Sequence, residues 1–334
     1  MTTTPYFRGT TAAVCLLFVS SSAFAQGKVG VGDEPSYTFR TSPLQGGGIQ
    51  SLKDLRGKPV LVDFWGTRCP PCIGFAVPSA IKLAERYGDD LAVVLVECQG
   101  SNAEQVASFA LRKKWLGNSA MWTTERVFNL GLSGIPHSAL ISPEGKIVVA
   151  GYTSKIHGEL EDKIAEYVKA QKSAPVGTPK ALKKAWTDFQ KGRYGSALDA
   201  ARKVASTEGN DTAAAKTAIE EFERRLEANL QRATWQIENG HPVDGLARLR
   251  KLTKGLESDK NSPFHTRVAA LVAKAESNKS EMAAAKAMAR IESRLYADGG
   301  KPASVKQLKG LASKYEGTQT AARANRIAKW AGSE

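Results

Sequence analysis

Cysteine is scarce in this chain of 334 residues, which has only Cys15, Cys69, Cys72 and Cys98. Four are far too few for a disulfide scaffold. Long apolar runs are also missing, and the hydrophobic (42%) and charged (24%) fractions are close to those of ordinary globular proteins. This composition excludes a disordered, collagen-like or polytopic membrane chain. The length predicts about two domains, each with its own core.

Acidic side chains are too few to balance the basic ones, and the net charge is +14. The imbalance is uneven, since residues 180–334 hold 29 basic and 18 acidic side chains, whereas residues 1–179 hold 18 and 15. We therefore expect the C-terminal half to attract acidic protein surfaces. Interleaved aromatic and basic binding motifs are absent, so nucleic acid is not an expected partner.

The first 25 residues have the layout of a secretory signal peptide. A single basic residue, Arg8, precedes the apolar run 12–18, and Ala23-Phe24-Ala25 resembles a cleavage site before Gln26. The predicted location is therefore the periplasm. A short membrane anchor is the alternative, and a lipoprotein is disfavoured because Cys15 lies inside the apolar run. Cleavage leaves Cys69, Cys72 and Cys98, and a close pair in an oxidising compartment favours redox chemistry.

Residues 26–170 alternate between strand and helix patterns. Residues 59–65 and 91–96 read as buried strands, and residues 138–142 and 146–150 as a hairpin around Pro143-Glu-Gly145. Helices are predicted near 71–87 and 103–115, followed by one with Leu160, Ile164 and Val168 on a single face. The pattern predicts an α/β domain with a central sheet flanked by helices.

Residues 171–179 contain two prolines and lack periodicity, which predicts a linker. From 180 to 334 apolar residues recur at helical spacing, with stops at Asn239-Gly240 and Gly299-Gly300, so an all-helical domain is expected. The segments 192–198 and 240–246 are similar to each other and resemble the corners of tetratricopeptide repeats, as a degenerate helical-repeat domain would show. A plain helical bundle is the alternative. We expect this basic module to fold separately and to bind acidic partners.

The chemistry of the chain is concentrated in Cys69-Pro-Pro-Cys72, which follows a predicted strand and opens a helix. The helix N-terminus favours the thiolate form of Cys69, which we expect to be the exposed attacking sulfur. Cys72 lies one turn further and suits a resolving thiol. Half of a zinc site has the same pattern, but the chain has no second cysteine pair.

This segment resembles the active site of the thioredoxin superfamily, and within it the secreted TlpA/ResA-like branch. Gly134-Ile-Pro136 resembles the cis-proline loop of the family, and residues 142–147 the hairpin behind it. Residues 32–35 and 49–59 resemble the N-terminal hairpin and lead-in strand of that branch. The resemblance covers about residues 30–170. It implies a central mixed sheet, a nucleophilic Cys69, a resolving Cys72, Trp65 as a wall of the site and Pro136 opposite Cys69.

Three positions depart from the usual pattern of this branch. Asp63 stands where the branch often has Asn, and it is a candidate proton acceptor for Cys72 unless it is solvated at the strand end. Arg68 stands where Trp is common, and it favours the Cys69 thiolate unless it points into solvent. The spacing from Cys72 to Pro78 is one residue longer than usual, and Phe75 or Ala76 replaces a common Glu. The last departure weakens a role in cytochrome maturation.

His137 and Cys98 are further candidates with two interpretations each. His137 either approaches Cys69 and Cys72, as a charge partner or third copper ligand, or faces the other side of its strand. Cys98 closes an apolar strand and reads as a buried core thiol rather than a third redox partner.

The favoured function is thiol-disulfide exchange with protein cysteines in the periplasm, with a membrane or periplasmic electron donor and no cofactor or metal. The helical domain would position partners. The alternatives are a copper-handling protein using Cys69, Cys72 and His137, a docking protein with a vestigial site, and a peroxidase, which lacks its motif. The direction of electron flow depends on the potential of the pair relative to its compartment.

Overall fold

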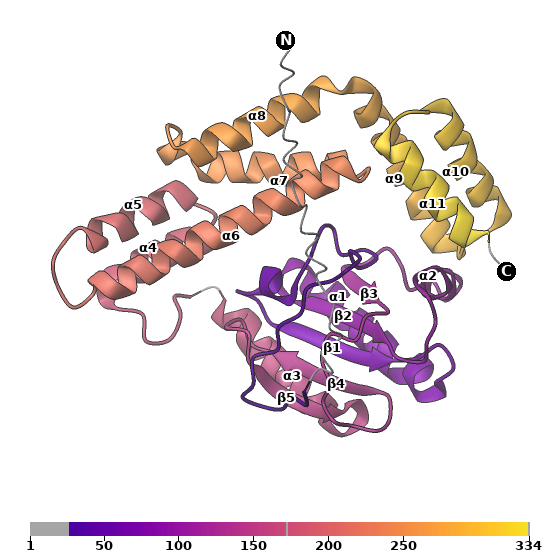
Figure 1. The fold of residues 1–334 in the computed structure, drawn as a ribbon, viewed down its shortest axis with the longest axis horizontal. Coiled ribbons are helices and arrows are strands. Elements are labelled where there is room, and N and C mark those ends of the chain that lie inside the picture. Colours follow the sequence, from indigo (N-terminus) through magenta and orange to yellow (C-terminus); the bar gives the residue numbers. More distant parts are fainter. Residues whose placement is uncertain (1–26, 172, 333–334) are drawn as a thin grey trace, which may run out of the picture.

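The computed structural model describes residues 27–171 and 173–332, so the predicted signal peptide with Cys15 lies outside the described residues. Five strands form one mixed sheet in the order β3-β2-β1-β4-β5 (Figure 1). The strands are β1 (Val60–Trp65), β2 (Ala92–Glu97), β3 (Ala120–Thr123), β4 (His137–Ile141) and β5 (Ile147–Tyr152). β1, β2 and β3 are parallel, whereas β4 runs antiparallel to β1 and β5. The predicted central mixed sheet is confirmed.

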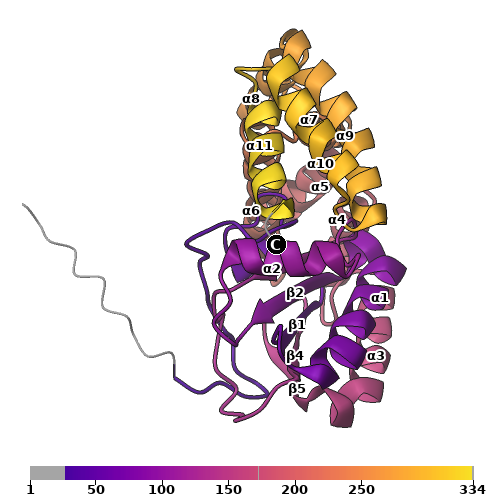
Figure 2. The ribbon, with the colours of Figure 1, turned by 90° about the vertical axis from the view of Figure 1, so that its right-hand side faces the viewer.

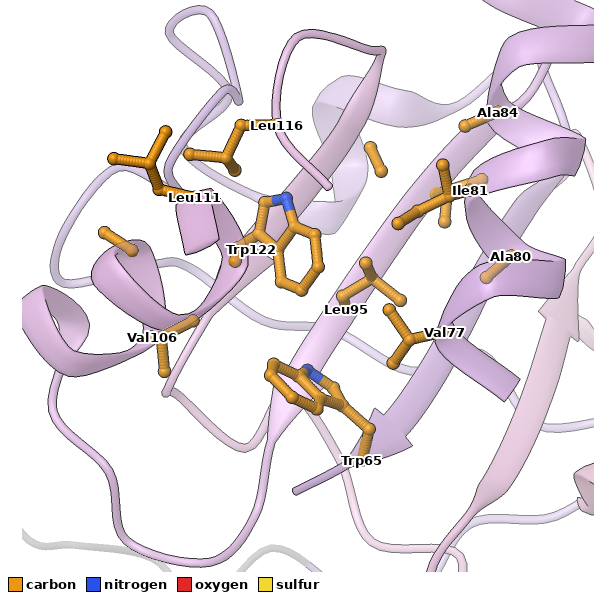
Figure 3. Packing of buried hydrophobic residues seen from close by; sticks show 14 of the residues in the cluster. Trp65, Val77, Ala80, Ile81, Ala84, Leu95, Val106, Leu111, Leu116 and Trp122 are labelled. Carbon is orange, nitrogen blue, oxygen red and sulfur yellow. The ribbon is translucent and has the colours of Figure 1, made fainter. Parts of the chain in front are cut away.

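Alternate residues of β1 and β2 enter two different cores, as the two-residue period of a strand requires. One face carries Leu61, Trp65 and Leu95, and it packs against α1 (Val77–Tyr87), α2 (Ala103–Arg112) and α3 (Thr153–Ala170). Figure 3 shows Trp65 and Trp122 on this face, between residues of α1 and α2. The other face carries Val62 and Phe64, and the segment before β1 covers it. Burial on both faces explains why these strands read as continuous apolar runs.

The N-terminal segment of the α/β region differs from the expected hairpin and lead-in strand. Between residues 27 and 51 only the isolated bridges of Lys28, Thr38 and Leu44 form, and then a short 3-10 helix spans Leu52–Leu55. Glu125 holds this segment in place, since it accepts hydrogen bonds from the Tyr37 hydroxyl and from the backbone amides of Arg40 and Thr41. The segment therefore covers this face of the sheet mainly with irregular structure.

The C-terminal region is entirely helical from Lys180 onward, apart from its turns. Its helices are α4 (Lys183–Gln190), α5 (Tyr194–Ala205), α6 (Thr212–Glu238), α7 (Pro242–Gly255), α8 (Pro263–Ser277), α9 (Lys279–Asp298), α10 (Pro302–Lys314) and α11 (Gln319–Ala331). α6 and α9 end at the two predicted stops, with Gly299 in the left-handed conformation after α9. The predicted all-helical C-terminal region is confirmed.

The helical region divides into two packing groups. α4 to α8 enclose their own apolar cluster, which is centred on Phe222, Leu226 and Leu249. Residues of α9 to α11 instead belong to the same cluster as the α-helical face of the sheet. Figure 2 shows α11 ending directly over α2. The α/β region and the last three helices therefore share one core.

Two contacts show how close this junction is. A Cβ built on Gly300 would lie 2.7 Å from Leu111 Cδ2, and Lys329 forms an ion pair with Glu104 at 2.7 Å.

Among the described residues, no helix combines the length and apolar character needed to cross a membrane.

Candidate functional site

Cys69 and Cys72 form a disulfide at the point where β1 passes into the first helix. Their Cα atoms are 5.2 Å apart. The Cys72 amide donates a hydrogen bond to Cys69 Sγ at 3.3 Å, so the first helical turn directs an N–H group at this sulfur. An N–H in this position stabilises negative charge on Cys69 when the disulfide is opened.

The two sulfurs differ in access, but less than the sequence suggests. Cys72 is completely buried, and Cys69 is only 6% exposed. Cys69 is therefore the more accessible of the pair, although the disulfide leaves it nearly covered rather than openly exposed. An approaching thiol would reach Cys69 first.

The loop before β4 lies against Cys69. The Ile135–Pro136 peptide bond is cis, and the Ile135 carbonyl oxygen is 3.8 Å from Cys69 Sγ. Pro136 itself is half-buried. The structure thus brings Pro136 to the first cysteine, as the resemblance implies.

The long spacing between Cys72 and Pro78 is accommodated by a π-helical turn. This turn spans Cys72–Ala76 and leads directly into α1. A π turn holds one residue more than an α-helical turn, so the helix absorbs the extra residue without breaking. Phe75 lies in this turn, is 38% exposed, and contacts the His157 ring edge to face with centroids 5.1 Å apart.

Asp63 is buried, which excludes a solvated position at the strand end. It is 1% exposed and lies on the sheet face that carries α1. Ser138 Oγ donates to Asp63 Oδ2 at 3.0 Å and is also 2.6 Å from Thr153 Oγ1, whereas Asp63 Oδ1 has no partner. Burial raises the pKa of Asp63 to about 7, although the Ser138 bond opposes the shift. Asp63 therefore changes charge near neutral pH.

Trp65 lies behind the cysteine pair in the interior. It is fully buried, and its ring packs edge to face against Trp115 and Trp122 with centroid distances of 6.1 and 5.5 Å. Cys69 and Cys72 belong to the same cluster. Trp65 is thus an inner support of the site rather than a surface wall.

Arg68 is exposed and bonded to the loop after β2. Its guanidinium donates to the Gln99 carbonyl oxygen at 2.9 Å, and its amide donates to Gln99 Oε1 at 2.7 Å. Buried Glu97 holds this loop by accepting hydrogen bonds from the Gln99 and Ser101 amides. Glu97 and Gln99 support the turn that carries Cys69, and the sequence does not predict either of them as a site residue. A buried acid that ends an apolar strand is the one signal that points to them.

His137 and Cys98 lie away from the cysteine pair. His137 stacks on Phe64 with centroids 4.6 Å apart, and Phe64 belongs to the opposite face of the sheet. Cys98 is half-buried against that same face rather than fully buried, and burial raises its pKa to about 11. In the described part of the chain, no group of three or more His, Cys, Asp or Glu side chains is placed to hold a metal ion.

Two curated proteins are similar to part of this chain. The thioredoxin-like protein YneN of Bacillus subtilis is 38% identical over 78 residues, which are 23% of this chain and 44% of YneN. The thiol-disulfide oxidoreductase ResA of Halalkalibacterium halodurans is 28% identical over 154 residues, which are 44% of this chain and 81% of ResA. The chain thus spans less than half of YneN. No protein-family model matches it.

Solved structures similar to this chain include a putative protein disulfide isomerase from Bacteroides thetaiotaomicron. It has 26% identity and a TM-score of 0.35, and the match covers 42% of this chain and 91% of that one. Another is a putative thiol:disulfide interchange protein DsbE from Chlorobium tepidum, with 22% identity, a TM-score of 0.34, and coverage of 42% and 99%.

The α/β region combines the predicted sheet with a cysteine pair at a helix start and a cis-proline loop. Its two curated relatives carry thioredoxin-like or thiol-disulfide oxidoreductase names. The thioredoxin-like fold and the resemblance to thiol-disulfide oxidoreductases are confirmed for this region.

Proposed function

We propose that this chain, whose α/β region is thioredoxin-like, is a thiol-disulfide oxidoreductase that exchanges disulfides with protein cysteines through Cys69 and Cys72. The observation that carries the proposal is the Cys69–Cys72 disulfide, with Cys69 Sγ next to the Cys72 amide and the Ile135 carbonyl. This arrangement provides a stabilised sulfur, a second sulfur one turn away, and a backbone edge for a substrate segment.

In the reductive direction, the Cys69 thiolate attacks one sulfur of a substrate disulfide. A Cys69–substrate bond forms, the substrate S–S bond breaks, and the other substrate sulfur leaves as a thiolate that takes up a proton. The Cys72 thiolate then attacks Cys69 Sγ, which restores the Cys69–Cys72 disulfide and releases the second substrate thiol. Two electrons pass to the substrate, and a membrane or periplasmic donor dithiol returns them. The oxidative direction is the reverse.

Asp63 is the proposed proton acceptor for Cys72. Its carboxylate lies on the face of the sheet that carries the Cys72 helix, and its pKa of about 7 allows both proton uptake and release at neutral pH. Oδ1 has no hydrogen-bond partner in the described residues, so it is free to accept a proton. Trp65 and Arg68 are proposed as supporting residues, and Pro136 as the contact for substrate backbone.

Single cysteine substitutions test the proposal. We expect Cys69→Ser to abolish insulin reduction and Cys72→Ser to accumulate a mixed disulfide, because only the second step is blocked. Cys98→Ser is the matched control and should retain full activity, since Cys98 lies on the other face of the sheet. Full activity of Cys69→Ser would refute the assignment.

We propose that residues 26–170 and 180–334 act as two domains joined by 171–179, with the second domain, tetratricopeptide-like, binding acidic protein partners. Support comes from its excess of basic residues and from the packing of consecutive helices on one another. Capture of partners by Cys72→Ser should weaken as salt rises, whereas reduction of a small uncharged disulfide should not. If partner capture and reduction of the small disulfide showed the same salt dependence, the proposed docking role would be refuted.

A periplasmic location is proposed from the sequence of residues 1–25. Export with cleavage after Ala25 predicts that the mature protein begins at Gln26. Intact mass spectrometry of the purified protein measures this directly. An N-terminus at Met1 in the native host would contradict the proposal.

A further inference from the structure

A large cavity of about 1140 Å³ lies at the junction of the two regions. Loops of the α/β region form one wall, including Gln45, Lys58 and Asp89, and helices of the C-terminal region form the other, including Arg232 and Gln236. Gly47 and Gly48 make the junction close, because a Cβ on either glycine would lie 3.0–3.2 Å from Trp235 or Gln236 of α6. The cavity thus exists only where the two regions meet.

Most acids that line the cavity already have partners. Glu104 pairs with Lys329, Glu292 with Arg323, and Asp244 with His241. Glu125 is held by Tyr37 and Arg40, as described above. Asp89 is exposed and forms no ion pair within the described chain.

The cations Lys58 and Arg232, by contrast, are half-buried and have no carboxylate partner among the described residues. Lys58 Nζ donates to the backbone carbonyl of Asp89 at 2.9 Å, and Arg232 Nε lies 3.4 Å from the carbonyl of Gly47. Arg248 of α7 does not line the cavity but is near enough for its charge to act on both, and its guanidinium donates to Asn229 Oδ1 at 2.8 Å. Lys58, Arg232 and Arg248 thus donate their hydrogen bonds only to neutral oxygens.

This grouping is electrostatically unfavourable as it stands. Burial, together with the charges of Arg232 and Arg248, lowers the pKa of Lys58 to about 8. Burial and the Arg248 charge lower the pKa of Arg232 to about 10. Partly buried like charges repel one another strongly unless counter-charges pair with them. Asp54, Asp89, Asp90 and Asp244 offset the repulsion in part, but none of them forms an ion pair with these cations among the described residues.

We propose that Lys58 and Arg232, with Arg248 nearby, bind a small multivalent oxyanion, a phosphate or carboxylate compound, across the interdomain cavity. A guanidinium presents paired N–H donors that match such oxygens, and an ammonium adds a compact positive charge. Because Lys58 belongs to the α/β region and Arg232 to α6, the anion contacts both regions at once and stabilises their junction. The site is separate from the cysteine pair and does not depend on the proposed redox function.

Calorimetric titration of the full chain tests the site, using inorganic phosphate and citrate in separate experiments at constant ionic strength. We expect saturable binding of at least one of them, weakened about tenfold or more in Arg232→Gln and in Lys58→Gln. Arg290→Gln is the control, since it removes an exposed α9 charge outside the cavity lining and should bind as the wild type does. All three variants should retain disulfide exchange.

The thermal midpoint separates binding from a structural role. In sodium chloride alone, Arg232→Gln should melt at or above the wild-type temperature because the repulsion is relieved, and phosphate should raise the midpoint of the wild type but not of the variant. If Arg232→Gln does not fold, Lys58→Gln on the opposite wall gives the same comparison. Phosphate binding alone assigns a phosphate site and citrate binding alone a carboxylate site. The proposal is overturned if neither phosphate nor citrate binds saturably. It is also overturned if Arg232→Gln and Lys58→Gln bind as tightly as the wild type does.

Discussion

Asp63 carries a carboxyl group in the interior, and its folded-state pKa of about 7 lies well above the value near 3.9 expected in an unfolded chain. Between these two values the folded state binds a proton that the unfolded state has lost. Stability therefore decreases as the pH rises from about 4 to 7, and above pH 7 the full penalty of a buried carboxylate remains.

Asp63→Asn should consequently stabilise the oxidised protein at pH 8, by up to roughly 4 kcal/mol for a shift of this size, and should change stability little at pH 4. Urea unfolding at the two pH values measures the difference. Asp199→Asn, at an exposed position of α5, is the control and should show no comparable pH dependence. A destabilised Asp63→Asn at pH 8 would mean that hydrogen bonding at Asp63 outweighs the burial of its charge.

Arg68 is expected to favour the thiolate of Cys69 and hence the reduced pair. Replacement by Trp should make the protein more reducing, by about 10–20 mV for an exposed charge. Equilibration with glutathione mixtures measures the potential. Because the Arg68 amide also donates to the Gln99 side chain, Gln99→Ala is the companion variant, which weakens loop support and keeps the Arg68 charge. An unchanged potential in Arg68→Trp would assign Arg68 to loop support alone.

At the scale of single residues, the sequence indicates which groups belong to the site but not what surrounds them. Cys69, Cys72 and Pro136 stand in motifs of fixed spacing, and the structure brings them together. Glu97 and Gln99 stand in no motif. Glu97 accepts from amides of its own loop, and Gln99 Oε1 accepts from the Arg68 amide of the loop after β1. The bond between Gln99 and Arg68 depends on tertiary geometry, and neither requirement leaves a periodic pattern.

Among the elements, the π turn after Cys72 illustrates both the strength and the limit of sequence reasoning. The extra residue before Pro78 is visible in the sequence, whereas the way a helix absorbs it is not, because a π turn and a broken helix satisfy the same spacing. β3 was missed for a different reason. Its four residues, Ala120–Thr123, are too few to show a period, and its pairing with β2 defines it.

The corner between α9 and α10 gives a prediction at this scale. Gly300 has φ +86° and faces Leu111 of α2, so Gly300→Ala should strain the backbone and push the corner away from α2. We expect a loss of about 1–3 kcal/mol in denaturant unfolding. Gly310 lies exposed in α10 with no atom near its would-be Cβ, so Gly310→Ala should stabilise by about 0.5–1 kcal/mol. Equal effects of the two substitutions would show that the corner does not depend on contact with α2.

For the whole molecule, the shared core bears on how the chain unfolds. The sequence predicts a helical module that folds separately, and that prediction remains to be tested. Leu111 and Leu116 belong to the same cluster as Leu308 and Ile327 of the last helices. Nothing in the sequence distinguishes an apolar residue that faces its own domain from one that faces another domain, so this junction could not be predicted.

A chain ending at residue 174 tests the junction. It should still reduce a small disulfide, because the cysteine pair and the Pro136 loop are retained, but its α/β region should be less stable by about 3 kcal/mol, the value for uncovering one or two large aliphatic side chains. Urea unfolding and binding of a hydrophobic dye measure the two effects. A fragment as stable as the full chain, without dye binding, would show that the shared cluster contributes little and would support separate folding.

The packing of α2 against the last helices also affects folding during synthesis of the chain. α2 ends at Arg112, whereas the helices that cover it begin at Lys279, so the ribosome completes one side of this contact long before the other. Until the last helices emerge, the outer side of α2 exposes apolar groups that incomplete chains could use to associate. A premature stop anywhere before α9 would leave this surface permanently open, so we expect the burden on chaperones to depend on the final 56 residues of the chain.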